Sequence, residues 1–272
     1  IWGMMIGEEG KTKIPILQYY TEKGFDPKKH ILQSYGTGWQ SASFLEQERQ
    51  LFGAPGGILT DWDLKTNIDG IYAAGDQLYA SDCCGFAAAT GYYAGRKAAA
   101  YADTVEIVKA PEEELDKEMK RLYGPLYVEE GMDWRELNQA ISKAMQNYCG
   151  GIKCKELLKE GLSLLKTYEE EMVPMISCKN PHELMRTHEV MDILEVAQMI
   201  LQACLFRESS SKELRFYRSD FPELDPDEDK CFITIRQEGG KAVRGKVPHD
   251  YYGDIEEEYK KYNQDYIRGE GV

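Results

Sequence analysis

Residues 69–102 read DGIYAAGDQLYASDCCGFAAATGYYAGRKAAAYA, and this stretch decides the fold. A short apolar run ends in Gly75 and Asp76, and a loop with two adjacent cysteines follows it. From Gly85 onward the residues are mostly Ala, Gly and Tyr in a helical pattern. The pattern predicts a buried strand, a loop, and a helix whose small side chains face the strand.

Small side chains serve two purposes at such a junction. They let the backbone approach a ligand closely, and the free N–H groups of a helix N-terminus carry partial positive charge. The sequence therefore suits a cofactor site, in which Gly75 leaves room at the strand end and Asp76 accepts hydroxyl groups. Tight helix–strand packing without any ligand is the alternative, because α/β folds use it commonly. Composition alone leaves both interpretations open.

The composition bounds the class of protein. The 272 residues contain 33 Lys and Arg against 47 Asp and Glu, a formal charge of −14. This acidity argues against nucleic acid or an anionic membrane as the main partner, and no apolar run reaches the roughly 20 residues of a membrane span. Seven cysteines, an odd number, favour reduced thiols in a cytoplasmic protein over a disulfide framework. The start at Ile1, without Met or a signal-like pattern, predicts a fragment of a longer protein.

The first region, residues 1–104, has a mixed texture. Two strands are expected, at Ile58–Thr60 and Gly70–Ala74, with polar turn residues between them. The helix expected next runs from Gly85 to Ala102. This region therefore predicts an α/β arrangement.

The second region, residues 105–216, repeats apolar positions at three- and four-residue intervals. This period predicts four helices with short connections, packed as a bundle. Asp133 is expected to cap one helix, and Asn180 with Pro181 to begin the longest. The third region, residues 217–272, is expected to be an irregular tail, apart from an alternating CFITIRQ stretch and an amphipathic helix near the end.

Three stretches carry a family resemblance. GGILTDWDLKTNIDGIYAAGD at 56–76 and GFAAATGYYAGRKAA at 85–99 resemble the C-terminal FAD-binding segment of the succinate dehydrogenase/fumarate reductase flavoprotein superfamily. RESSSKELRFYRSDFPELD at 207–225 is similar to a stretch near the end of that family's helical domain. The superfamily also includes, as a more distant relative, the adenylylsulfate reductase alpha subunit.

The resemblance implies a fold of α/β plus α type. Residues 1–104 would form the C-terminal portion of a Rossmann-like FAD-binding domain, with a remnant of the capping domain in 1–55. A helical domain at 105–216 and the tail at 217–272 would follow. FAD would be the cofactor of the intact protein and would bind this fragment weakly or not at all.

The resemblance also assigns residue roles. Asp76 takes the position of a family Glu that hydrogen-bonds the ribityl chain, and Ala87 and Ala88 match a pair whose backbone N–H groups face the flavin ring. Gly56 and Gly57 match glycines at which the backbone approaches closely. The implied cofactor-binding set is Gly56, Gly57, Gly75, Asp76, Ala87 and Ala88.

Two departures from the family pattern bear on substrate and completeness. The loop QLYASDCCGF at 77–86 lacks the family's His and Arg, which hold dicarboxylates, so the expected substrate is not a simple dicarboxylate. No G-x-G-x-x-G fingerprint follows a strand, which implies that an N-terminal half carrying it is missing. The partners implied are that half, a small-molecule substrate and a partner redox subunit.

The predicted function is that of an FAD-dependent oxidoreductase that transfers hydride between flavin N5 and an organic substrate, with the fragment alone inactive. The alternative is a non-catalytic helical interaction module or a subunit of a larger redox complex. Polar side chains that would face a substrate are Tyr79, Asp82, Arg207, Arg218 and His249. For the two arginines, a structural ion pair is the ordinary role.

The cysteines and histidines give weaker signals. Cys83 and Cys84 would border the flavin, where a redox role competes with simple burial. Cys149 and Cys154 form one C-x4-C pair, too few ligands for zinc or an iron–sulfur cluster. No metal site is predicted.

Overall fold

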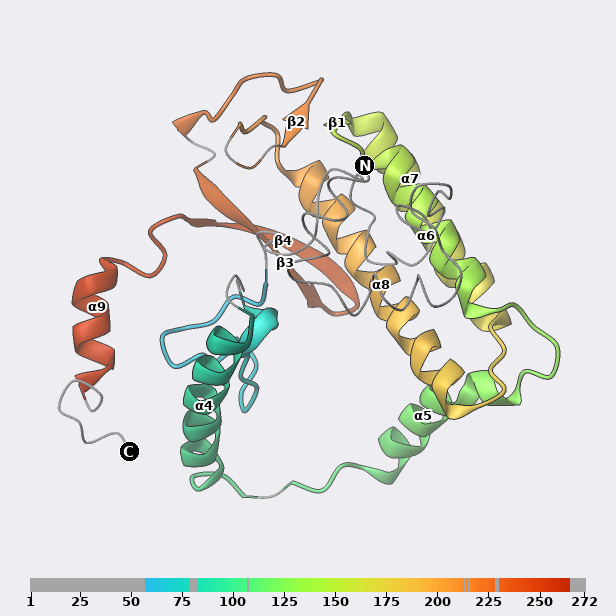
Figure 1. Cartoon of the computed structure of the whole chain (residues 1–272), viewed down its shortest axis with the longest axis horizontal. Coiled ribbons are helices and arrows are strands. Elements are labelled where there is room, and N and C mark those ends of the chain that lie inside the picture. The colour runs from blue at the N-terminus through green and yellow to red at the C-terminus, as the bar shows by residue number, and fades with distance from the viewer. Residues whose placement is uncertain are drawn as a thin grey trace, which may run out of the picture. The chain divides into compact units, whose positions relative to one another are not determined.

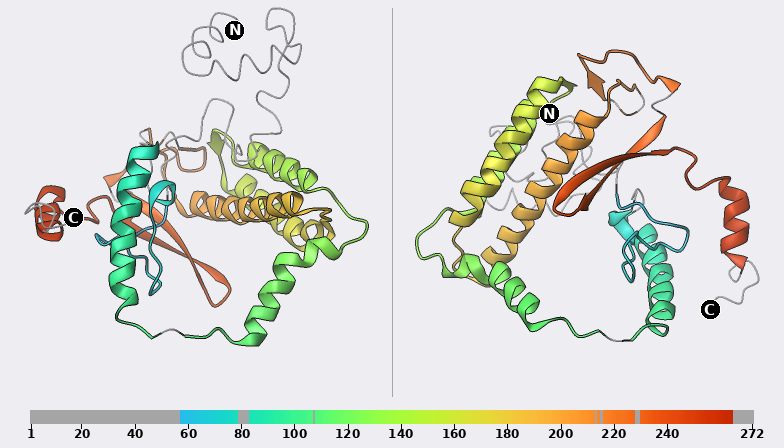
Figure 2. Two further views of the ribbon diagram at one scale, coloured as in Figure 1. Left: turned by 60° about the horizontal axis from the view of Figure 1, so that its bottom comes forward. Right: turned by 180° about the vertical axis from the view of Figure 1, so that it is seen from behind.

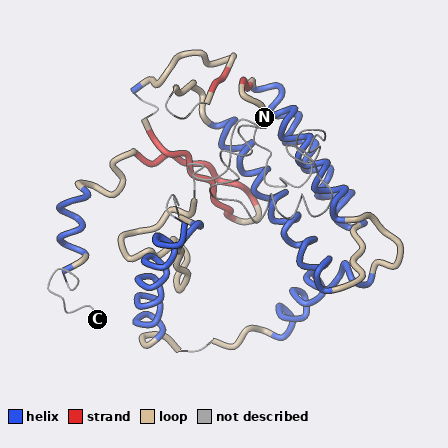
Figure 3. Tube along the Cα trace, viewed as in Figure 1, coloured by secondary structure: helices blue, strands red, loops and turns tan. Residues whose placement is uncertain are grey.

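The computed structural model describes residues 57–78, 83–106, 108–212, 214, 216–227 and 230–264. These residues lie in one compact unit, Ser41–Val272. Helices dominate the described part, and two small sheets of two strands each complete it (Figure 1, Figure 3).

Three helices form the bundle predicted for the middle of the chain. They are α6 (Trp134–Tyr148), α7 (Lys155–Thr167) and α8 (Pro181–Phe206), and α8 contacts both others (Figure 1). The predicted caps are confirmed, because the Asp133 carboxylate accepts a hydrogen bond from the Arg135 N–H and the Asn180 side chain accepts one from the Glu183 N–H. Each cap satisfies an N–H group that the helix itself leaves without a partner.

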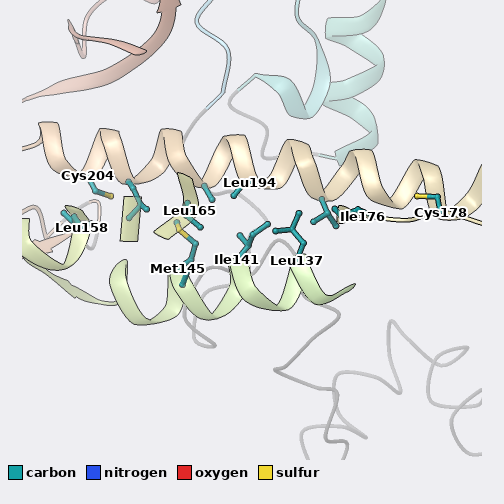
Figure 4. Packing of buried hydrophobic residues seen from close by; sticks show 13 residues of the cluster. Leu137, Ile141, Met145, Leu158, Leu165, Ile176, Cys178, Leu194 and Cys204 are labelled. Atoms are coloured by element: carbon teal, nitrogen blue, oxygen red, sulfur yellow. The ribbon is translucent and has the colours of Figure 1, made fainter. Parts of the chain in front are cut away.

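The hydrophobic core lies between these helices. Side chains of α6 point towards those of α8 in Figure 4. Gly161 on α7 permits a close approach to α6, because a Cβ there would lie 2.6 Å from the Cβ of Tyr148. The fully buried members of the cluster are Leu137, Ile141, Leu158, Leu165, Ala197 and Leu201.

The end of α7 and the connection to α8 are irregular helix. A π-helical turn (Tyr168–Met172) and a 3-10 turn (Val173–Met175) follow α7 directly. The segment that follows lies beside the residues just before α6, since Met132 and Ile176 form a parallel bridge. Ile176 is buried and joins the core there.

Helix α5 (Glu112–Tyr123) precedes the bundle and behaves differently. Three glutamates occupy its first turn and two basic residues its last turn, the distribution that the helix dipole favours. It contains no buried residue, and Leu115, Met119 and Tyr123 on it are exposed. A 3-10 turn, Gly124–Tyr127, follows it and contacts α8.

A short parallel pair of strands closes the far end of the bundle. Strand β1 (Ile152–Lys153) pairs with β2 (Tyr217–Arg218), so residues that immediately follow α6 meet residues beyond α8. Backbone hydrogen bonds therefore join residues on the two sides of the predicted boundary at 216. The three-domain division itself stays a prediction.

The expectation of an irregular tail after 217 was wrong. Strands β3 (Cys231–Glu238) and β4 (Lys241–Pro248) form an antiparallel hairpin that contacts α8 (Figure 2). Its two-residue turn is Gly239–Gly240, both with positive φ, which suits the twist of a hairpin. The alternating 231–237 stretch is confirmed as a strand, and the amphipathic helix near the end is α9 (Ile255–Tyr262).

The two strands predicted before α4 were also wrong. Ile58–Thr60 and Gly70–Ala74 contain no strand, and an isolated antiparallel bridge joins Lys65 to Tyr72. Short extended segments need several paired neighbours to make a stable sheet, and among the described residues they have this bridge and a few separate backbone hydrogen bonds. The helix expected after them is confirmed as α4 (Cys83–Ala102), which begins two residues earlier than predicted.

Candidate functional site

The candidate site is the junction between residues 73–78 and the first turns of α4. Gly75 opens a short 3-10 turn, Gly75–Gln77, in the left-handed conformation with φ +65°. A Cβ at this position would lie 3.4 Å from the Cβ of Ala87 on α4. That separation is an ordinary van der Waals contact, so glycine is favoured here by its backbone conformation.

A side chain of α4 holds this turn in place. The N–H of Gly75 donates to Thr90 Oγ1 at 2.9 Å, and that hydroxyl donates to the Phe86 carbonyl at 2.7 Å. The second bond keeps the hydroxyl proton on the helix, which leaves its oxygen free to accept from Gly75. The turn and the helix are thus connected through one threonine.

Gly57 is a point of close backbone approach. A Cβ there would lie 2.5 Å from the Leu78 carbonyl oxygen, so any other residue would force the backbone apart. Next to it, the N–H of Ile58 donates to the Gln77 carbonyl at 2.7 Å. The close approach is made to this protein's own backbone, and a cofactor contact at Gly57 stays a prediction. Gly56 lies outside the described residues.

Asp76 lies beside this junction with its side chain exposed. Its carboxylate accepts no hydrogen bond from the described residues. The group is therefore able to accept hydroxyl hydrogens from a ligand without first breaking an internal bond.

Ala87 and Ala88 are exposed on α4. Because α4 begins at Cys83, their backbone N–H groups fall in the second turn, where the helix uses them for its own hydrogen bonds. The N–H groups that the helix leaves without partners belong to its first turn, which includes Cys83, Cys84 and Gly85. The N–H groups that α4 leaves without helical partners therefore begin at Cys83, four residues before Ala87, the first of the pair that the resemblance implied.

A second group of contacts holds one side of α4 against the loop of residues 57–72. Lys97 forms an ion pair with Asp63 at 2.8 Å, and the Tyr93 hydroxyl donates to the same carboxylate oxygen at 3.3 Å. The hydrogen bond that Lys97 donates to Asp63 raises the pKa of the Lys97 ammonium, and burial raises the pKa of Tyr93. Both groups keep their protons at neutral pH, so their role is to hold the helix against the 57–72 loop.

The C-terminal part of the chain packs on the same loop. The Tyr252 hydroxyl donates to the Thr60 carbonyl at 2.7 Å. The Trp62 ring stacks on Tyr262 of α9 at 5.9 Å and meets the edge of Tyr252 at 5.6 Å. Sequence reasoning missed these contacts, because nothing local links residues about 190 positions apart.

The two candidate arginines are buried away from this junction. Arg218 donates to both carboxylate oxygens of Asp220, at 2.8 and 2.6 Å, and to the carbonyls of Cys204 and Arg207. These bonds lower the pKa of Asp220 to about 2, with the hydrogen bond from Arg218 as the largest cause. Arg207 donates to the Cys231 carbonyl at 2.7 Å. Both guanidinium groups therefore tie the end of α8 to the segments that follow it.

Of the other residues singled out from the sequence, one lies in the first turn of α4, one lies at the end of the hairpin, and two lie outside the described residues. Tyr79 and Asp82 lie outside the described residues, and Cys84 is an exposed thiol on α4. His249 packs against the Phe232 ring at 4.8 Å on the hairpin. Among the residues that the structure describes, no three His, Cys, Asp or Glu side chains gather as metal ligands.

Comparison with known proteins shows what this chain is similar to. Residues 138–248 match the sequence model of the family described as fumarate reductase flavoprotein C-term. The chain is 29% identical over 117 residues to the alpha subunit of adenylylsulfate reductase from Megalodesulfovibrio gigas, a stretch that covers 41% of this chain and 17% of that protein.

Solved structures show the same fold. Adenylylsulfate reductase from Archaeoglobus fulgidus superposes with a TM-score of 0.64 at 18% identity, covering 90% of this chain and 46% of that chain. A quinol fumarate reductase chain from E. coli gives 0.60 at 19% identity, covering 71% of this chain and 36% of that one.

These findings confirm the family resemblance. The chain is similar to the C-terminal part of flavoproteins of the succinate dehydrogenase/fumarate reductase superfamily. It spans less than half the length of each of the relatives named. None of the helices described is both long and apolar enough to cross a membrane.

Proposed function

We propose that this chain supplies part of the FAD site of an FAD-dependent oxidoreductase. The observation that carries the proposal is the junction of Gly75 with α4, where a positive-φ glycine holds backbone close to the start of a long helix. The family relationship supports it, because the relatives are flavoproteins by name or by family. The sequence motif and the local geometry fall on the same residues.

The described residues fit such a cofactor. The exposed Asp76 carboxylate would accept hydroxyl hydrogens of the ribityl chain, and Ala87 and Ala88 present only methyl groups, which leave space for a flat ring. The first-turn N–H groups of α4 would stabilise negative charge at the ring edge. FAD, when bound, supplies hydride exchange at N5. Thr90 and the Asp63–Lys97 pair hold the turn and the helix in register for this contact.

We further propose a substrate other than a simple dicarboxylate. A buried dicarboxylate needs cationic or multiply hydrogen-bonding partners, and the stretch 77–86 contains no Lys, Arg or His. Arg207 and Arg218 already donate to groups of this chain. The curated relative is named for adenylylsulfate, which is not a dicarboxylate, and this agrees with the proposal.

A second candidate is a helical interaction module within a larger redox complex. The apolar side chains of α5 favour it, because Leu115, Met119 and Tyr123 are exposed on a helix that buries none of its residues. Exposed apolar stripes of this kind often mark contacts with another protein surface. This candidate is compatible with the first, since a flavoprotein subunit of a complex would need both surfaces.

Purified full-length protein separates these possibilities. Its flavin absorbance and the release of FAD on denaturation test the first proposal. Reduced viologen then serves as electron donor in parallel assays with fumarate and with adenylylsulfate. Turnover of fumarate at tens per second, a rate typical of competent enzymes, would overturn the substrate proposal, whereas protein without flavin in any preparation would favour the interaction module.

A further inference from the structure

Two cysteines lie close together at the far end of the bundle. Cys149 is the residue at which α6 ends, and Cys204 lies two residues before the end of α8. Their sulfur atoms are 3.9 Å apart, although 55 positions separate them in the chain. Cys204 is buried, whereas Cys149 is only half-buried and is the more exposed of the two residues.

We propose that Cys149 and Cys204 form a reversible disulfide when the protein meets a peroxide, and that this bond joins the ends of α6 and α8. A disulfide needs its sulfurs about 2.05 Å apart, so the pair must close by less than the width of one atom. Cys149 has already left helical geometry, with φ −121° and ψ 29°, and Gly150 and Gly151 follow it. The backbone can therefore adjust on that side while α8 stays intact.

The surroundings distinguish the two sulfurs. The hydrogen bond with Cys149 raises the pKa of Cys204 well above its usual value, and burial adds to this. Cys204 therefore keeps its proton at neutral pH, and Cys149, the more exposed of the two residues, is the one placed to meet the oxidant. Lys153 and Arg218 supply positive charge nearby, since the Lys153 ammonium donates to the Gly150 carbonyl and the Arg218 guanidinium to that of Cys204.

The chemistry balances with hydrogen peroxide as oxidant. The Cys149 thiolate attacks one peroxide oxygen, the O–O bond breaks, and hydroxide leaves, so that the sulfur becomes a sulfenic acid. The Cys204 sulfur then attacks the Cys149 sulfur, the S–O bond breaks, and the oxygen leaves as water with the proton of Cys204. Two thiols and one peroxide give one disulfide and two waters, and a dithiol reductant reverses the change by exchange.

The other described thiols are arranged differently. The Cys178 sulfur lies 3.0 Å from the Thr187 hydroxyl inside the core, and Cys84 is exposed on α4. Cys154 is half-buried and only five residues beyond Cys149, which makes it the matched control. A selective bond between Cys149 and Cys204 would therefore report the geometry of the pair and not general oxidation of thiols.

Peptide mapping tests the proposal directly. The purified protein is treated with a small excess of hydrogen peroxide, its remaining thiols are alkylated, and trypsin digestion follows without reductant. Cleavage after Lys153 separates Cys149 from Cys154. The expected product is one linked pair of peptides carrying Cys149 and Cys204, lost on dithiothreitol treatment, and an oxidised protein that melts at a higher temperature than the reduced one.

Variants complete the test. Cys154→Ser should keep the linked peptide and the rise in melting temperature, whereas Cys149→Ser should lose both. Wild-type protein alone decides the matter if a variant fails to fold. A Cys149 oxidised to sulfinic or sulfonic acid without any link to Cys204, or a link from Cys149 to a different cysteine, would overturn the proposal.

Discussion

Helices α4 and α8 are both long, and the chain uses them in opposite ways. In α8, six residues are buried, and five of them contribute to the core that the bundle shares. In α4, Ala94 alone among the described side chains is buried, and most of the Ala and Gly residues face solvent. The small side chains of α4 therefore do not serve the packing of a core. We propose that they allow a ligand to approach the helix closely.

The largest expected effect lies in the bundle. Leu201→Ala removes a fully buried side chain of α8 and should lower the free energy of unfolding by about 2–5 kcal/mol, because a cavity remains. Met199→Ala on the same helix is the control, since Met199 is more than one-third exposed and should cost far less. Urea unfolding of both variants measures this difference. Equal losses would mean that α8 is not a core helix.

The next effect concerns the ligand and not the fold. Asp76→Ala in the full-length protein should weaken FAD binding by about 1.5–3 kcal/mol, the range for hydrogen bonds to charged groups. The stability of the isolated chain should not change, because Asp76 is exposed and bonded to no described residue. Asp103→Ala, at the other end of α4, is the matched control. If FAD affinity is the same in all three proteins, Asp76 is not in the site.

Two glycine substitutions sharpen the comparison between the regions. Gly161→Ala should destabilise the protein by about 1–3 kcal/mol, since its Cβ would meet Tyr148 at 2.6 Å. Gly91→Ala on α4 should stabilise the isolated chain by up to about 1 kcal/mol, because nothing lies within 4 Å and alanine is the better helix former. Thermal melts of the two variants measure both signs. A destabilising Gly91→Ala would show that α4 is already packed on this side.

The smallest expected effect is on the pH dependence of stability. The bond from Arg218 lowers the folded-state pKa of Asp220 to about 2, from an ordinary value of 3.8. Because the folded pKa is lowered, the contribution is present above about pH 4 and is lost as the pH falls towards 2. Asp220→Asn should flatten the acid limb of a stability curve over that window, and an unchanged limb would contradict the assignment.

Local signals allowed much of the helical region to be predicted. Asp133 and Asn180 were recognisable as caps because a helix cap depends on residues that are near one another in the sequence. The hairpin was missed although Gly239 and Gly240 stand between its strands, since only β3 shows clear alternation and β4 is a basic strand interrupted by Gly245. The two adjacent glycines were therefore the available signal for a hairpin turn at this position.

The sites were harder to predict, because their contacts are distant in sequence. The motif singled out Gly75 and Asp76, which lie in the turn before α4 and whose role stays a prediction, but the start of α4 could not be fixed to the residue. No sequence pattern indicated that Arg218 would be buried against the end of α8, or that the sulfur atoms of Cys149 and Cys204 would lie close together. Such pairs depend on how the helices pack, which a single sequence does not state.

Amide hydrogen exchange with and without FAD tests the central claim most directly. In the full-length protein, FAD should slow exchange at residues 75–90, where the turn and the start of α4 meet, and should leave the core of α6 and α8 unchanged. Exchange in the bundle thus serves as the internal control. Protection confined to the bundle, or no protection at residues 75–90 at saturating FAD, would contradict the account.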